Sequence, residues 1–145
     1  MGSDRMKVLI DTNIAITYIS GRSDPFSTEI EEIMRLCASE EIDGFLAFHS
    51  LSTIWYVSRK SPDNERRKWI RKLCTLLTVS GADNSLILSA IDNDAFKDFE
   101  DALQDCCAIE AEVDYIVTAN IRDFAGHSKT TPLTPSEFLT MLHKR

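Results

Sequence analysis

Apolar positions along this chain follow two alternating patterns, short continuous runs and longer stretches in which they recur every three or four residues. The short runs are rich in branched side chains and predict buried strands, whereas the longer stretches predict helices with one apolar face. Strands are expected at 7–10, 44–48, 77–80, 115–118 and 133–134, and helices at 13–20, 28–39, 50–59, 65–77, 83–91, 98–112 and 135–142. Such alternation predicts an α/β fold, with a mainly parallel sheet of four to five strands flanked by helices.

One domain is expected over 6–142, between a start at 1–5, interpreted as a leftover of cloning or a frayed end, and a tail at 143–145. A chain of 145 residues buries enough surface to fold without disulfides or a structural metal. It contains no apolar run long enough to span a membrane and no apolar leader. The four cysteines lack CxxC spacing, which favours reduced core thiols in a cytoplasmic protein.

The formal net charge of −7 argues at first against a nucleic-acid partner. The charge is unevenly placed, however, because residues 92–114 hold nine acidic residues and one basic residue, a net −8. The remainder of the chain then carries +1. The acidity therefore belongs to one segment and says more about that segment than about the partners of the whole protein.

Polar side chains follow two of the predicted strands. Asp11 comes directly after the first strand, and Asn120 and Asp123 follow the fourth strand. In parallel sheets, sites form beyond the carboxyl ends of the strands. We therefore expect these side chains to lie near one another at one edge of the sheet.

The acidic helix expected at 98–112 sorts its side chains by face. At about 100° per residue, one face holds Asp98, Asp101, Asp105 and Glu112, and the adjoining apolar face holds Phe99, Ala102, Leu103 and Cys106. Glu100 points away from both faces and is expected in solvent. One interpretation is structural: Asp98 caps the helix and the other acids form its solvated face, favoured by the helix dipole near the N-terminus.

The other interpretation is a metal site. Carboxylates gathered at one edge of a sheet repel one another, and a hard divalent cation such as Mg²⁺ or Mn²⁺ offsets this repulsion. Such an ion generates hydroxide from bound water and stabilises the charge that develops on a phosphodiester. The combination of strand-end polar residues and an acidic helix favours this interpretation.

The chain resembles the PIN domain family, the ribonuclease fold of VapC-like toxins from toxin–antitoxin pairs. The resemblance covers residues 6–142 and rests on the order and spacing of four segments: Val8-Leu-Ile-Asp11-Thr-Asn13, Asp98-Phe-Glu-Asp101-Ala-Leu103, Tyr115-Ile-Val-Thr118-Ala-Asn120-Ile-Arg-Asp123-Phe124 and Leu133-Thr-Pro-Ser-Glu-Phe138. It implies a cytoplasmic ribonuclease that depends on Mg²⁺ or Mn²⁺ and acts on RNA. It also implies a homodimer and an antitoxin protein as partners.

The resemblance also implies roles for individual residues. The cation is expected on Asp11, Asp101 and Asp123, with support from Asn120 and Asp98. Four further residues are expected to shape the pocket: Thr12, Asn13, Thr53 and Thr118. One position departs from the family, because Thr53 stands where the family usually places a glutamate in the helix after the second strand.

A basic segment at 59–72 carries a net charge of +5. Positive side chains interleaved with an aromatic residue are typical of nucleic-acid contacts. The candidates for contact with RNA are Arg59, Lys60, Arg67 and Arg71. A structural interpretation competes with this one, because Trp69 lies on the apolar face of the same predicted helix and is expected in the core.

Two other functions remain open. The missing glutamate at Thr53 is compatible with a catalytically weakened PIN-like module that binds RNA or a protein. A phosphatase of the haloacid-dehalogenase type also places an aspartate after the first strand. That chemistry needs a second aspartate two residues later, where this chain has Asn13, so this alternative is ranked last.

Overall fold

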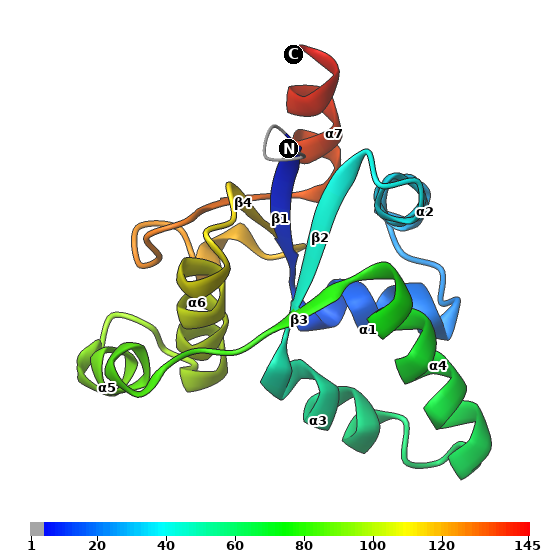
Figure 1. Cartoon of the computed structure of the whole chain (residues 1–145), viewed down its shortest axis with the longest axis horizontal. Helices are drawn as coiled ribbons and strands as arrows, with labels where there is room; N and C mark the ends of the chain where they lie inside the picture. The colour runs from blue at the N-terminus through cyan, green and yellow to red at the C-terminus, as the bar shows by residue number, and fades with distance from the viewer. Residues whose placement is uncertain (1–4) are drawn as a thin grey trace.

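The computed structural model describes residues 5–145, and five parallel strands form its centre (Figure 1). The strands are β1 (Met6–Ile10), β2 (Ile42–Ala47), β3 (Thr78–Ser80), β4 (Tyr115–Val117) and β5 (Thr131–Leu133). Their order across the sheet is β3-β2-β1-β4-β5, and each neighbouring pair is parallel. The expected α/β fold with a parallel sheet is therefore confirmed.

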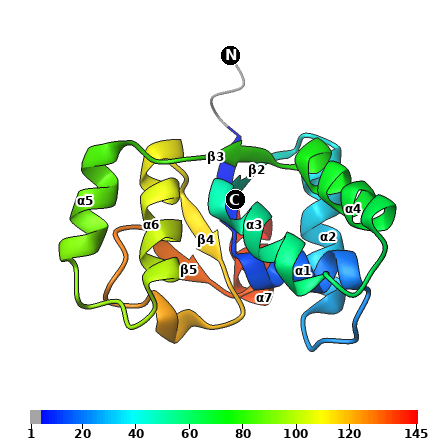
Figure 2. The same cartoon turned by 90° about the horizontal axis from the view of Figure 1, so that it is seen from below.

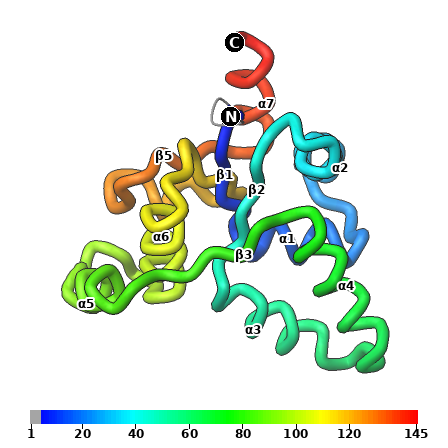
Figure 3. Tube along the Cα trace, in the orientation of Figure 1, coloured from blue at the N-terminus to red at the C-terminus, as the bar shows by residue number. Residues whose placement is uncertain are grey.

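Helices cover both faces of this sheet. Within residues 5–145 they are α1 (Thr12–Ser20), α2 (Ser27–Ala38), α3 (Phe48–Val57), α4 (Asp63–Leu76), α5 (Asn84–Asp92), α6 (Phe99–Ala111) and α7 (Pro135–His143). Figure 2 shows α5 and α6 on one side of the strands, and α1, α2, α4 and α7 on the other. The tube in Figure 3 shows β2 leading directly into α3 at the lower end of the sheet.

The central strand β1 supplies side chains to both layers. Val8 and Ile10 belong to the apolar cluster formed with α1, α2 and α7, while Leu9 belongs to the cluster formed with α5 and α6. All three side chains are fully buried. Burial on both faces explains why this strand is a continuous apolar run, without the polar alternation of a half-exposed strand.

Several element ends differ from the sequence-based expectation. Phe48, expected to end the second strand, begins α3 and is largely exposed. Helix α7 continues to His143, one residue into the expected tail, and a short 3₁₀ helix (Ile121–Asp123) follows β4. Of the expected frayed start, residues 1–4 lie outside the described residues, whereas Arg5 pairs with Asp43 at 3.3 Å.

The cysteines are free thiols, as expected. Cys37, Cys106 and Cys107 are buried, but Cys74 is exposed on α4, so the expectation of four core thiols was wrong at this position. Throughout residues 5–145, each helix is too short or too polar to cross a bilayer.

Candidate active site

Two strand ends bring Asp11 and Thr118 together. Ile10 of β1 is paired with Val117 of β4, and the Asp11 amide donates to the Val117 carbonyl at 3.0 Å. The residue after each strand therefore lies at the same edge of the sheet. Thr118 Oγ1 donates to Asp11 Oδ2 at 2.8 Å, so these two expected site residues are in direct contact.

Asp11 is held on its other side by Gln104 of α6, a residue that the sequence did not indicate. Gln104 Nε2 donates to Asp11 Oδ1 at 2.7 Å, and its Oε1 accepts from the Thr12 amide at 3.3 Å. Both Asp11 and Gln104 are buried. Burial raises the pKa of Asp11, and the hydrogen bonds from Gln104 and Thr118 partly offset this rise. Each oxygen of Asp11 accepts one of these bonds and keeps a second lone pair for another ligand.

Asp101 lies in the first turn of α6 and is only partly buried. Burial is the largest cause that raises its pKa to about 7, followed by the negative charges of Asp11, Asp123 and Asp98. Charges shift a pKa in this way when they lie in the same region of a protein. The acidic residues that the sequence assigned to the cation therefore lie within range of one another's charge.

These carboxylates form no ion pair in the described part of the chain. Every ion pair within residues 5–145 is made by an arginine elsewhere, namely Arg5, Arg35, Arg66 or Arg67. Asp11, Asp101 and Asp123 are thus not neutralised by an ion pair within residues 5–145.

The remaining polar residues of this edge are more exposed. Asp98 caps α6, because its Oδ1 accepts from the Glu100 amide at 2.9 Å, as the structural interpretation expected. The Asn120 amide donates to Thr118 Oγ1 at 3.1 Å, which fixes the start of the loop after β4. Asp123 ends the 3₁₀ helix of that loop, and its side chain is exposed.

Two acidic residues on the predicted acidic face of α6 do not belong to the site. Asp105 is buried and accepts from the Lys129 amide at 3.3 Å, so it holds the loop before β5. Glu112 lies beyond the C-terminal end of α6 in a left-handed conformation with φ 55°. Of the four acids on this face, only Asp98 and Asp101 at the start of α6 therefore remain candidates for the site. Phe99, expected in the core, is 50% exposed at this start.

The expectation that Glu100 lies in solvent was wrong. Its side chain is half-buried, and its Oε2 accepts from Thr53 Oγ1 of α3 at 2.7 Å. The angular positions along α6 did not indicate this contact, because they describe that helix alone. The long glutamate side chain extends to the neighbouring helix α3, and the angles along α6 say nothing about where α3 lies.

The donor set fits a hard cation by its chemistry. Among residues 5–145 no three Asp, Glu, His or Cys side chains converge on one point as a ready ligand set. Mg²⁺ does not need such a set, because it usually keeps several waters and is bound by one or two carboxylates. Carboxylate oxygen donors, such as those of Asp11 and Asp101, are the ligands that Mg²⁺ and Mn²⁺ prefer.

The residues expected to shape the pocket have different positions. Thr12 is buried, and its Oγ1 lies 2.6 Å from Ser50 Oγ, a hydrogen bond that joins the first turns of α1 and α3. Asn13 is exposed and lines a hollow of about 480 Å³ between α1, α3 and α4. Trp69, expected in the core, is half-buried and lines the same hollow.

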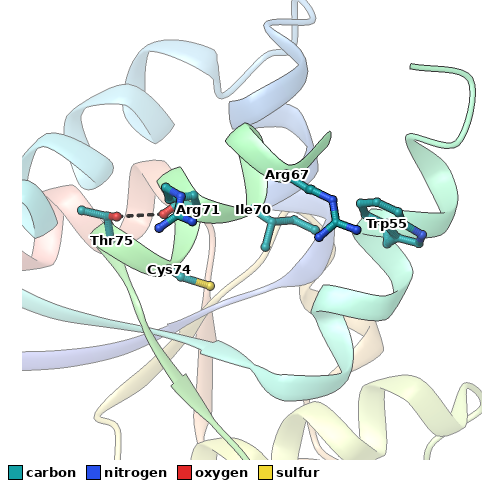
Figure 4. A pocket seen from close by; sticks show the side chains of 6 residues that line it. All are labelled: Trp55, Arg67, Ile70, Arg71, Cys74 and Thr75. Atoms are coloured by element: carbon teal, nitrogen blue, oxygen red, sulfur yellow. Dashed lines mark hydrogen bonds between the residues drawn. The ribbon is translucent and has the colours of Figure 1, made fainter. Parts of the chain in front are cut away.

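The basic segment forms a separate surface on α4 and the end of α3. This surface has a hollow of about 640 Å³. Figure 4 shows the residues that line it: Trp55, Arg67, Ile70, Arg71, Cys74 and Thr75. Arg66 covers one face of the Trp55 ring at 3.6 Å and donates to the Trp55 carbonyl, so that face is closed to a nucleobase. Arg59 lies over the Tyr56 ring at 4.2 Å, and Lys60 is exposed.

Comparison with known proteins gives the same fold. In the structure of VapBC2 from Rickettsia felis bound to a promoter DNA fragment, one chain aligns over 89% of this chain and 98% of its own length, with 16% identity and a TM-score of 0.67. VapC20 of Mycobacterium tuberculosis, described as a toxin that cleaves the sarcin–ricin loop, aligns over 78% of this chain and 89% of its own length, with 14% identity and a TM-score of 0.56. A search of curated proteins gave no match. A family model described as a PIN domain matches residues 7–122, well over half of the sequence, and this chain therefore belongs to the PIN domain family.

Proposed function

We propose that this protein is a Mg²⁺- or Mn²⁺-dependent ribonuclease, the toxin of a toxin–antitoxin pair. The observation that carries the proposal is the set of carboxylates around Asp11 and Asp101 at the carboxyl edge of the sheet, which form no ion pair in residues 5–145. Membership of the PIN domain family supports a nuclease and removes the haloacid-dehalogenase alternative.

Asp11, Asp101 and Asp123 would hold the cation, with Asn120 and Asp98 in support. When bound, such a cation activates water for attack on a phosphodiester and stabilises the charge that develops on the phosphate. Gln104 and Thr118 keep Asp11 in place by donating to its two oxygens. Each donor favours the ionised form of this buried carboxyl, the form that binds a cation.

The raised pKa of Asp101 suits the same role. A carboxyl that titrates near 7 without metal loses its proton when a cation binds beside it. Binding is therefore coupled to proton release from Asp101. This coupling makes cation affinity, and with it RNA cleavage, increase with pH through the neutral range.

The substrate and partners belong to the same proposal. RNA as substrate and an antitoxin as partner are supported by the two similar structures, one described as a cleaver of the sarcin–ricin loop and the other as a VapBC complex. A homodimer is supported by exposed apolar side chains on two adjacent helices, Leu88 and Ile91 on α5 and Phe99 on α6. The cytoplasm is the proposed location.

The test uses purified protein on a mixed set of RNAs. Wild-type protein with Mn²⁺ is expected to cleave RNA, whereas addition of EDTA or the substitution Asp11→Asn abolishes cleavage. Equal cleavage by the wild type and Asp11→Asn, or cleavage that EDTA leaves unchanged, contradicts the proposal.

A second candidate is a catalytically weakened PIN-like module that binds RNA or a protein. It is favoured by the lack of three converging ligands within residues 5–145. Calorimetric titration with Mn²⁺ separates the two candidates, because only the ribonuclease requires binding at millimolar ion or below. RNA binding without any Mn²⁺ binding or cleavage supports this second candidate.

A further inference from the structure

We propose that Glu100 is a further carboxylate of the cation site and that Thr53 is the residue that positions it. The inference rests on the proposed function, because it assigns two residues to the same site. It reverses the sequence-based expectation for Glu100, which placed this side chain in solvent. It also gives Thr53 a definite task in place of a general pocket-shaping one.

The geometry that carries the proposal is a contact between two helices. Glu100 lies in the first turn of α6, next to Asp101, and Thr53 lies in the middle of α3. Thr53 Oγ1 donates to Glu100 Oε2 at 2.7 Å, and both side chains are half-buried. The hydrogen bond fixes one carboxylate oxygen, and within residues 5–145 the other oxygen has no hydrogen-bond partner. Glu100 is therefore held in one orientation, and one of its carboxylate oxygens is left for a further ligand.

The charge of Glu100 acts on the other members of the site. Burial raises the pKa of both Asp11 and Asp101, and the nearby negative charge of Glu100 raises both further. Glu100 itself takes part in none of the ion pairs seen in the described part of the chain. A carboxylate within range of the charge of two others, with no ion pair in residues 5–145, is unfavourable, and a divalent cation near them offsets this repulsion.

A purely structural role for this contact is the alternative. Glu100 would then only link α6 to α3, and its charge would be incidental. The substitution Glu100→Gln separates the two roles, because an amide oxygen still accepts the hydrogen bond from Thr53 while the negative charge is removed. The matched control is Glu110→Gln, an equal change of charge at an exposed position near the other end of α6.

The experiment measures Mn²⁺ binding directly, from the paramagnetic resonance signal of free Mn²⁺, on folded protein without RNA. Glu100→Gln is expected to weaken Mn²⁺ binding by about tenfold or more, whereas Glu110→Gln stays within about twofold of the wild type. Equal affinity of Glu100→Gln and the wild type overturns the role of Glu100 and leaves the proposed ribonuclease standing. Absence of Mn²⁺ binding by the wild type overturns both.

The role of Thr53 is tested in the same assay. Thr53→Val removes the hydroxyl at nearly constant volume and is expected to weaken Mn²⁺ binding severalfold, while Thr53→Ser restores it. The exchange Thr53→Glu with Glu100→Thr is expected to retain binding, because Oγ1 and Oε2 are adjacent and the carboxylate only changes helix. Wild-type affinity in Thr53→Val overturns the positioning role, and a melting curve confirms that each variant is folded.

Discussion

Gln104 Nε2 lies 2.7 Å from Asp11 Oδ1, although 93 positions separate the two residues. This buried hydrogen bond ties the acidic helix α6 to the end of the central strand β1. It therefore sets the distance between Asp11 and the acids in the first turn of α6. The relationship makes Gln104 as important to the site as the carboxylates themselves.

Substitution Gln104→Leu is expected to lower the free energy of unfolding by about 1–3 kcal/mol, because it leaves the buried Asp11 carboxyl and the Thr12 amide without their partner. Urea denaturation measures this change. In the background of Asp11→Asn the cost is expected to shrink, since less charge is left unpaired. A decrease below about 0.5 kcal/mol, in the range of a surface substitution, contradicts the account.

The stability of the metal-free protein is expected to fall as pH increases from 5 to 8. The pKa of Asp101 is raised from 3.8 to about 7 in the folded state, and that of Asp11 is also raised. Between these values the folded protein binds more protons than the unfolded chain, so deprotonation on raising the pH destabilises the fold. Melting temperatures at pH 5, 6, 7 and 8 in EDTA measure the effect.

A matched variant isolates this contribution. Burial lowers the pKa of His49, and this shift makes the stability of the folded protein increase with pH below 6.5. The contribution of Asp101 is therefore measured as the difference between the wild type and Asp101→Asn. The variant is expected to lose most of the decline between pH 5 and 8. Millimolar Mn²⁺ at pH 8 is expected to raise the melting temperature of the wild type more than that of Asp101→Asn. Identical pH profiles of the two proteins refute the raised pKa of Asp101.

Gly44 in β2 has no room for a side chain. An added Cβ would lie 2.5 Å from Leu77 Cδ2 and 2.6 Å from Cys37 Sγ, whereas the same change at Gly81 meets open space. Gly44→Ala is therefore expected to destabilise the protein by about 1–3 kcal/mol through overpacking. Gly81→Ala is expected to stay within about 0.5 kcal/mol of the wild type. Equal urea midpoints for the two variants disprove this packing argument.

The hollow between α3 and α4 offers a test of RNA binding away from the carboxylates. Arg67 and Arg71 both line it. Their joint replacement by alanine is expected to weaken binding to a single-stranded RNA and to lower the slope of log affinity against log salt by about one for each phosphate that is no longer neutralised. The control is Arg35→Ala, an arginine on α2 paired with Glu32 at 2.7 Å. Unchanged affinity and slope exclude this surface from the RNA path.

The sequence predicted the helices and strands that neighbouring residues determine. The apolar run of β1 identifies a strand buried on both faces, and the helix expected at 135–142 is α7. Asp11 and the polar residues that follow the fourth strand were predicted to lie near one another, because parallel strands end at one edge of a sheet. Each of these inferences needs only neighbouring residues or a general rule of sheet geometry.

The residues that the sequence did not place depend on how α6 packs against the rest of the chain. Gln104 is one polar residue in a helix, and no spacing rule shows that it reaches Asp11. Glu100 and Asp105 were assigned by angle alone, but one turns toward Thr53 and the other toward the amide of Lys129. Tertiary packing determines such long-range partners, and the periodicity of a single helix carries no information about that packing.

Equilibrium binding of Mn²⁺, measured by calorimetry on the wild type and on Asp11→Asn with Asp101→Asn, tests the central claim most directly. The account predicts that the wild type binds Mn²⁺ with release of protons near pH 7 and that the double variant, although folded, binds about a hundredfold more weakly or worse. Equal affinities, or no binding by the wild type, would contradict a cation site at the carboxyl edge of this sheet.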